Sequence, residues 1–396
     1  MNLRQAIAVS KYAEKNGFSN VKINDGHWHI SRHRPVEESF SLMNKAADYL
    51  GIDKVALLSY EYADDVGIDN SSNLKALYFK DRGEGRYYSF AAITHFGDER
   101  DNAENFLRQA QLYYDLGFDG IKILEGKTDY HRHFNCKFDG ERYEPLFSFL
   151  EEKRFPVVMH IGHFVPFPDC ENTKERDLIQ GEMLNVLKKH PHLPVVFAHM
   201  FNMVHNRPHL EKILETYPDV FLDLALGGDF FIRFSEDIDG WREFFRKFGD
   251  RVIFGTDTYN SYFSENDDFE ITTRYAPIRK FFESSEPFTA TYYDISPAVY
   301  GENVVLIPAL LPENVVENVY VNSFVKAFGS EPRKTDREKS KKYCEDVLAG
   351  YKNGTLKSSL TKPLPPWLEE AVRKNAQRAE KLAFENIAVI KEFYGD

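Results

Sequence analysis

Short runs of apolar residues recur along the chain, and segments with helical periodicity separate them. We expect eight of these runs to be strands, and several are continuous rather than alternating, as in a parallel sheet covered on both faces. Their starts lie about 26 to 38 residues apart, close to the length of one strand plus one helix. The runs begin near Val21, Val55, Tyr87, Gly120, Pro156, Pro194, Val220 and Val252.

Helical patterns fill the intervals between the runs. Eight strand–helix units favour an α/β fold of the (β/α)8 TIM-barrel type. An open doubly wound sheet is the alternative, but the glycine-rich phosphate-binding turn typical of that fold does not follow the first run. The clearest expected helices are Val36–Leu50, Asp101–Leu116, Tyr143–Lys153, Glu175–Lys189 and Trp241–Phe248.

The barrel is expected to carry additions at both ends. Residues 1–20 fit one amphipathic helix, Leu3–Lys15, which would lie at the bottom of the barrel. The (β/α)8 domain is expected to cover residues 21–330, with an insertion at 260–312 and a helix at Pro312–Gly329.

Residues 331–396 fit a charged helical extension of the barrel. Two helices are expected there, broken at residues 352–354 and 363–366. An apolar stripe on the last helix indicates docking against the barrel or against a second subunit, so a homo-oligomer is one expectation. The stripe consists of Leu368, Val372, Leu382 and Ile390.

Composition and charge narrow the class of partners. Hydrophobic residues make up 42% and charged residues 28% of the chain, as in an ordinary globular protein. The formal net charge of -12 argues against nucleic acid and against anionic membranes, because both require clustered Lys and Arg. No apolar stretch approaches the roughly 20 residues that span a bilayer.

The cysteines and the first residues indicate a cytoplasmic protein. Cys136, Cys170 and Cys344 are far apart, which disfavours a zinc ribbon or a dithiol redox site and fits a reducing compartment. The first residues lack the apolar core of a secretory signal.

Metal-capable side chains end several of the apolar runs. His27 and His29 end the first run, and because strand side chains alternate, both imidazoles are expected to point into the barrel, with Asp25 as a third residue on that side. His160 and His199 end the fifth and sixth runs. A neutral histidine buried there without a partner is costly, and a divalent metal supplies one.

Asp257 ends the eighth run and can act as a metal ligand and proton acceptor or simply as a helix N-cap. Each of these residues alone also fits a structural role. Together, at the carboxyl ends of parallel strands, they predict one metal site. Asp223 lies in the seventh run and is expected to be structural.

Lys122 lies inside the fourth apolar run, where a lysine carries a desolvation cost. Three roles remain open for it. It can be carboxylated and bridge two metals, it can hold a substrate carboxylate, or it can reach out between the barrel and its helices.

Other polar residues near the strand ends are candidates for substrate binding. Arg32 and Arg34 follow the first run, at the face where barrel active sites form. On an acidic protein this local positive cluster indicates an anionic small-molecule substrate, although a solvated loop fits equally well. The remaining candidates are Tyr60, His95, Glu125 and His163.

Together these residues resemble a known family. Residues 311–329 resemble the closing helix of the amidohydrolase family 2 group within the amidohydrolase superfamily, and the resemblance covers roughly residues 20–330. The other motifs that carry it, in order and strand position, are Asp25-x-His27-x-His29, Gly120-Ile121-Lys122, His160, His199 and Asp257.

The resemblance implies a distorted (β/α)8 barrel that binds a divalent metal, most often zinc, with manganese as the alternative. The implied ligands are His27, His29, His160 and Asp257, while His199 would polarise the substrate or bind a second metal.

The expected reaction is hydrolysis of an ester, lactone or amide bond in a small, carboxylate-bearing molecule by metal-activated water. Asp257 would accept the proton of that water. A metal-dependent non-oxidative decarboxylase or hydratase is the alternative enzyme class. The third possibility is a non-catalytic binding protein with a vestigial site.

Overall fold

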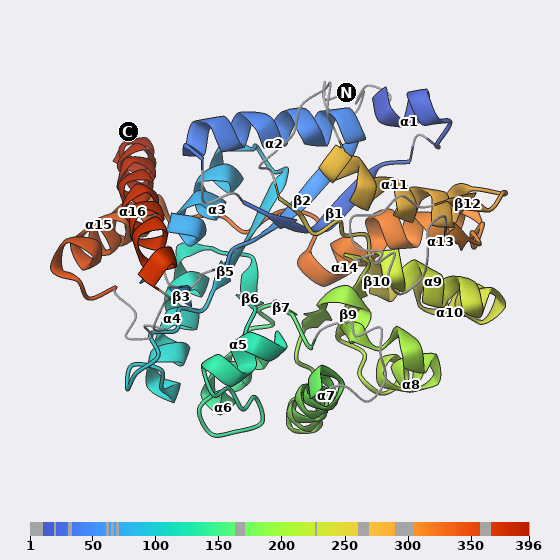
Figure 1. The fold of residues 1–396 in the computed structure, drawn as a ribbon, viewed down its shortest axis with the longest axis horizontal. Coiled ribbons are helices and arrows are strands. Elements are labelled where there is room, and N and C mark those ends of the chain that lie inside the picture. Colours follow the sequence, from blue (N-terminus) through green and yellow to red (C-terminus); the bar gives the residue numbers. More distant parts are fainter. Residues whose placement is uncertain are drawn as a thin grey trace.

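The computed structural model shows a barrel of parallel strands surrounded by helices (Figure 1). No helix in the described part of the chain is both long and apolar enough to cross a membrane. The described residues are 11–19, 21–30, 34–60, 63–64, 67–68, 71–162, 171–225, 228–259, 269–289, 304–356 and 366–395.

All strands of the main sheet pair in parallel, in the order β10-β9-β8-β7-β6-β5-β2-β1-β11. Each of the eight apolar runs contains one of these strands, which confirms the predicted (β/α)8 barrel. The strands are β1 (Ile23–His29), β2 (Ile52–Leu58), β5 (Tyr87–Ala92), β6 (Gly120–Ile123), β7 (Val157–Met159), β8 (Val195–Phe197), β9 (Val220–Asp223), β10 (Val252–Ile253) and β11 (Thr258–Tyr259).

The eighth strand of the barrel is broken into β10 and β11. β10 pairs with β9, and β11 pairs with β1, so the two halves together close the sheet. Between them, Gly26 N–H donates to Phe254 O at 2.8 Å and Asp257 N–H donates to His27 O at 2.8 Å. These two bonds hold the break against the end of β1.

Helices cover the outside of the sheet. The predicted helix Val36–Leu50 has those bounds in the structure, and the other four predicted helices overlap observed ones. The helices are α2 (Val36–Leu50), α3 (Ser71–Arg82), α4 (Ala103–Leu116), α5 (Thr128–His133), α6 (Glu144–Glu152), α7 (Glu171–Lys189), α8 (Arg207–Thr216), α9 (Gly228–Glu236), α10 (Ile238–Phe248) and α11 (Phe269–Glu283). The short 3-10 turns are η2 (Ala198–Asn202), η3 (Val204–Asn206) and η4 (Gly249–Arg251). Two small antiparallel pairs of strands lie outside the main sheet. They are β3 (Ala63–Asp64) with β4 (Gly67–Ile68), and β12 (Phe288–Thr289) with β13 (Val305–Leu306).

Helix α4 begins two residues later than predicted because Asn102 caps it. The Asn102 side chain accepts a hydrogen bond from Asn105 N–H. The carboxylate of Asp101 is used elsewhere, since it accepts the backbone N–H groups of Phe96 and Gly97, both at 2.7 Å.

The segment predicted as one closing helix consists of α13 (Glu313–Glu317), the π-helical turn η5 (Asn318–Asn322) and α14 (Ser323–Phe328). It plugs the end of the barrel where the strands begin. Phe324 and Phe328 join the cluster of buried side chains that fills the barrel interior. Their rings contact Tyr88 and Phe90, with centroids 5.0 and 4.8 Å apart. The interior is therefore apolar at this end.

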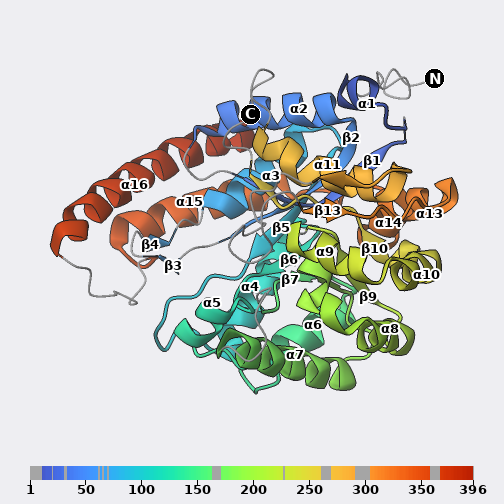
Figure 2. The same ribbon diagram turned by 45° about the vertical axis from the view of Figure 1, so that its right-hand side comes forward.

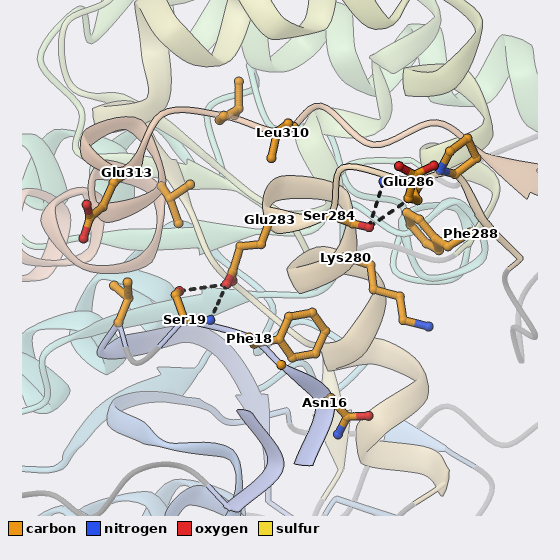
Figure 3. Close-up of a pocket in the computed structure, with 15 residues that line it drawn as sticks. Asn16, Phe18, Ser19, Lys280, Glu283, Ser284, Glu286, Phe288, Leu310 and Glu313 are labelled. Atoms are coloured by element: carbon orange, nitrogen blue, oxygen red, sulfur yellow. Dashed lines mark hydrogen bonds between the residues drawn. The ribbon is translucent and has the colours of Figure 1, made fainter. Parts of the chain in front are cut away.

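The chain ahead of β1 also lies at this end. Of the predicted helix Leu3–Lys15, the described part is α1 (Lys11–Asn16), and residues 1–10 lie outside the described residues. Figure 3 shows that Ser19 N–H and Oγ–H donate to Glu283 Oε2 in α11, at 2.9 and 2.7 Å. These bonds border a cavity of about 610 Å³ whose walls include Phe18 and Leu310. Because this segment precedes β1, the cavity lies at the opposite end of the barrel from the strand-end histidines.

The C-terminal extension forms two helices, α15 (Arg337–Asn353) and α16 (Pro366–Gly395), broken where the sequence predicts. They lie side by side (Figure 2), with α16 against α3 and α15 against α4. Of the predicted apolar stripe, Ile390 is buried and Leu382 half-buried, while the side chains of Leu368 and Val372 lie outside the described residues. The sequence predicts that this stripe docks on the barrel or on a second subunit. The structure shows the first of these, because the described part of the last helix packs against the barrel.

Asn386 in α16 supplies a cap to a helix that lies 350 residues away in sequence. Its Oδ1 accepts Val36 N–H, the first of α2, at 2.8 Å. Asn386→Ala should therefore lower the free energy of unfolding by about 0.5–2 kcal/mol, the cost of losing a helix cap, as measured by urea denaturation. Val389→Ala, on the exposed side of the same helix, is the control and should change it by less than about 0.5 kcal/mol. Equal losses in both variants would contradict this capping role.

Candidate metal centre

Two imidazoles and a carboxylate converge at the carboxyl end of β1. His27 Nε2 and His29 Nε2 are 3.2 Å apart. Asp257 Oδ1 lies 3.4 Å from the first and 3.1 Å from the second. The potential ligand atoms of these three residues all lie within 4.8 Å of one another. Within the described part of the chain, this is the group of His and acidic side chains that could hold a metal ion.

The break in the eighth strand brings Asp257 to this point. Asp257 has a φ of 53°, in the left-handed region that non-glycine residues seldom adopt. Gly255, two residues earlier, lies against β1, where a Cβ built on it would stand 3.1 Å from His27 Cβ. A continuous strand would carry the chain past the site, whereas the turn directs the carboxylate back towards both histidines.

The contacts of the other ring nitrogens, Nδ1, fix the tautomer of both imidazoles. His29 Nδ1 is 2.8 Å from the carbonyl oxygen of Leu58, which can only accept, so Nδ1 carries the proton. His27 Nδ1 donates to Asp223 Oδ2 at 2.8 Å. Burial lowers the pKa of His27 and so favours the neutral ring. In the neutral rings, both Nε2 atoms bear lone pairs.

Electron pairs thus face one another at 3.1–3.4 Å, which fits a bound cation. Two imidazole nitrogens and a carboxylate oxygen are a donor set that zinc prefers, and ligands at about 2.0–2.1 Å from zinc stand roughly 3.3 Å apart at the corners of a tetrahedron. The residues present therefore fit the predicted divalent metal.

Asp223 holds the site together from behind. Its Oδ2 accepts from His27, and its Oδ1 accepts His199 N–H at 2.8 Å and Ala225 N–H at 3.1 Å. Burial alone would raise the pKa of Asp223, but His27 and the His199 N–H hold it below its ordinary value. The sequence predicts only a structural role for Asp223. The available signal is its position at the end of an apolar run, which it shares with the proposed ligands.

Arg274 is a residue of the site that the sequence does not predict. Its Nη1 donates to Asp257 Oδ2 at 2.9 Å and leaves Oδ1 facing the histidines. Burial would raise the pKa of Asp257, but the neighbouring imidazoles of His29 and His27 and the guanidinium of Arg274 hold it well below its ordinary value. Arg274 comes from α11, within the region expected to be an insertion, where no pattern marked a site residue.

His160 and His199 form a second imidazole pair beside the first. His199 Nδ1 contacts the carbonyl oxygen of Ala225, and its Nε2 is 3.0 Å from His160 Nδ1. The His199 ring lies 5.3 Å from the His27 ring, between centroids. His160, which the sequence grouped with the ligands, thus lies next to the three-residue group but outside it.

A left-handed turn presents His199. His199, Met200, Phe201 and Asn202 all have positive φ, between 48° and 59°. L-residues avoid this conformation at a cost of roughly 1–2 kcal/mol each, so the surrounding contacts must stabilise the turn. One such contact is the stack of Phe201 on Phe197, with centroids 4.0 Å apart.

Asp25 does not point towards the candidate metal centre, contrary to the expectation from strand alternation. β1 has an extra residue between Asp25 and Trp28, which breaks the strand alternation. Asp25 is in register with Val55, whose side chain packs among the outer helices. The Asp25 side chain is therefore on the outer side of the sheet. Its carboxylate accepts Thr256 Oγ–H at 2.6 Å and His27 N–H at 2.9 Å. Asp25 therefore supports the two segments that carry the site.

Lys122 points into the barrel. It is in register with Val158, which belongs to the interior cluster, and its side chain is buried. This excludes the predicted alternative in which it reaches out between barrel and helices. Its Nζ has no hydrogen-bond partner among the described residues. Burial lowers the pKa of Lys122 to about 8, although the charges of Asp223 and Asp257 oppose the shift.

His95 and Glu125 form a buried pair near the ends of β5 and β6. His95 Nε2 is 3.3 Å from Glu125 Oε1, and Asp101 lies 3.7 Å from the other ring nitrogen. Burial raises the pKa of Glu125. Phe106 and Phe134 pack against the His95 ring, with centroids 4.8 and 4.7 Å away.

The other residues predicted to bind the substrate differ in where they lie. Tyr60 packs edge-on against His29, with centroids 5.1 Å apart, and so borders the candidate metal centre. Arg34 pairs with Glu38 in the first turn of α2, as the solvated-loop interpretation expects. Arg32 and His163 lie outside the described residues.

Gly126 holds the Glu125 loop against β7, since a Cβ on it would stand 1.8 Å from His160 O. Gly126→Ala should therefore lower the free energy of unfolding by about 1–3 kcal/mol, as overpacking does. Gly181, inside α7, is the control because a Cβ there meets nothing within 4 Å. Gly181→Ala should stabilise the protein by about 0.5–1 kcal/mol. Wild-type stability in Gly126→Ala would contradict the close approach.

Comparisons with known proteins identify the family. The model of the family described as "Amidohydrolase" matches residues 72–284, more than half of the chain. No curated protein matches its sequence.

Several solved structures are similar at low identity. A dihydroorotase from Campylobacter jejuni is 13% identical, with a TM-score of 0.42, over 79% of this chain and 84% of its own. An IDCase from Metarhizium anisopliae in apo form is 14% identical, with a TM-score of 0.44, over 74% and 78%. An amidohydrolase from Mycobacterium avium subsp. paratuberculosis K-10 is 12% identical, with a TM-score of 0.41, over 75% of both chains. Family membership rests on the family model: the chain belongs to the amidohydrolase family of TIM-barrel enzymes.

Proposed function

We propose that this enzyme is a metal-dependent hydrolase that cleaves an ester, lactone or amide bond in a small, carboxylate-bearing substrate. The convergence of two lone-pair-bearing Nε2 atoms and Asp257 Oδ1 carries this proposal. His27, His29 and Asp257 would hold the ion, with His160 as a further ligand. Zinc suits this donor set best, and manganese is the alternative.

A bound divalent cation would supply Lewis acidity, making water acidic near neutral pH and polarising a carbonyl group. Asp257 would accept the water proton at Oδ1, while Arg274 holds Oδ2. Its low pKa keeps this carboxylate ionised, so Oδ1 has an electron pair to offer the proton. The leaving group would then take a proton from the same carboxyl.

The tautomer of His199 favours one of its two predicted roles. The carbonyl oxygen of Ala225 places the proton on Nδ1, so Nε2 offers an electron pair. The burial-lowered pKa of His199 disfavours a second proton. An electron pair suits a metal ligand, whereas polarising a substrate oxygen would require a donor at Nε2.

Lys122 supports a substrate with a carboxylate. Its amine is buried inside the barrel without a hydrogen-bond partner among the described residues, and a substrate carboxylate would supply one. Carboxylation of the amine is the other role that remains open, and it would promote binding of a second metal. Tyr60, His95 and Glu125 would contact the rest of the substrate.

The decisive experiment combines elemental analysis of the purified protein with a screen of lactones, esters, amides and carboxylic acids. Metal-dependent release of acid from one of these bonds supports the proposal. Release of CO2 from a carboxylic acid would instead assign the enzyme to the lyases. Absence of metal after addition of zinc or manganese would overturn the metal-dependent reaction.

Removal of one ligand should empty the centre. His27→Ala should lose most of its metal after gel filtration, because it deletes one of three converging donors. His190→Ala is the control, since His190 is also buried but pairs with Glu144 and Glu151 in the helical layer. Full metal content in His27→Ala, measured by elemental analysis, would contradict the assignment.

Asp223 should control metal affinity without touching the metal. Asp223→Asn weakens the acceptor that orients His27, so affinity in a competition titration should fall about 10- to 100-fold. Asp119→Asn is the control because Asp119 is equally buried but pairs with Lys80. It should affect stability alone. Similar affinities in both variants would contradict the role of Asp223.

A further inference from the structure

The left-handed turn at residues 199–202 connects both outer histidines of the site. His199 begins the turn, and its imidazole contacts that of His160 through Nε2 and Nδ1, 3.0 Å apart. Asn202 ends it, and its side-chain amide donates to Ile161 O, immediately after His160, at 2.8 Å. The turn and the end of β7 are therefore bound together at two points.

Gln180 secures the turn from the outside. Its side-chain amide, on α7, donates to Phe201 O at 2.8 Å and to Asn202 O at 3.4 Å. Gln180 is 5% exposed, so water cannot readily replace it as the donor for these carbonyls. Because residues with positive φ relax when their contacts are lost, removing these bonds should release the turn.

We propose that Gln180 and Asn202 are positioning residues: they hold residues 199–202 in the left-handed turn and thereby fix the His160–His199 pair relative to the metal centre. Neither residue reaches the reacting atoms. Gln180 acts on His199 through the backbone of Phe201 and Asn202, and Asn202 acts on His160 through the backbone of Ile161. The catalytic consequence rests on the proposed function, whereas the ordering of the turn does not.

Helix α7 contains a matched control. Glu182 lies two residues from Gln180 and is similarly buried at 8%, but its Oε2 accepts from His131 Nε2 and Phe138 N–H, both at 3.0 Å. Gln180→Glu and Glu182→Gln are isosteric changes in opposite directions on one helix. The first removes the donor to the turn, and the second weakens a bond to α5 and the loop after it.

Hydrogen exchange measured by mass spectrometry tests the ordering of the turn without any substrate. In Gln180→Glu, peptides covering residues 198–206 should exchange at least about tenfold faster than in the wild type, whereas in Glu182→Gln they should not. Gln180→Met, which lacks both donor and charge, should reproduce the effect and serves if Gln180→Glu does not fold. Wild-type exchange in both Gln180 variants, or equal acceleration in Glu182→Gln, would overturn the proposal.

Kinetics on the substrate found by the screen test the catalytic consequence. Misplacing His199 should lower kcat in Gln180→Glu on the order of 10- to 100-fold with little change in KM, while Glu182→Gln keeps the wild-type kcat. Faster exchange with unchanged kcat would overturn the positioning role. If no substrate is found, the proposed function fails while hydrogen exchange still decides whether Gln180 orders the turn.

Discussion

The buried carboxylate of Asp223 is the constraint on which the geometry of the candidate metal centre depends. A carboxylate buried in a barrel interior is costly unless its oxygens are hydrogen-bonded, and Asp223 accepts three bonds. One fixes the ring of His27, and another fixes the backbone of His199. Because these residues belong to β1 and the turn after β8, one anion on β9 sets the relative positions of three strand ends. The same bonds leave an electron pair on His27 Nε2.

The second constraint is closure of the barrel by a broken strand. A continuous eighth strand would pair with both neighbours along its length but would alternate its side chains regularly. The break between β10 and β11 gives up some of this pairing and places Asp257 in a left-handed conformation. The bonds from Gly26 and Asp257 to the opposite backbone recover part of the lost pairing. Strain is thus concentrated where the carboxylate is needed.

Local patterns were sufficient to predict most of the barrel and the residues at its mouth. Each apolar run ends at the carboxyl edge of the sheet, so the side chains of His27, His29 and Asp257 had to gather there. The patterns failed where the backbone departs from regular geometry. The bulge in β1 reverses the side of Asp25, and no polarity pattern marks it. The turn at residues 199–202 contains no glycine, the usual sequence sign of positive φ, and Arg274 contacts Asp257 only through tertiary packing.

The charges at the barrel mouth bear on the kind of substrate proposed. Asp223 and Asp257, both with lowered pKa, face Lys122 and Arg274, so these four charges balance near neutral pH. Burial raises the pKa of Glu125, which disfavours a further negative charge at this position. A divalent cation held by neutral imidazoles would therefore leave an excess of positive charge in a buried site, where such an excess is costly. Hydroxide and a substrate carboxylate would both relieve it, which favours a small anionic substrate over a neutral one.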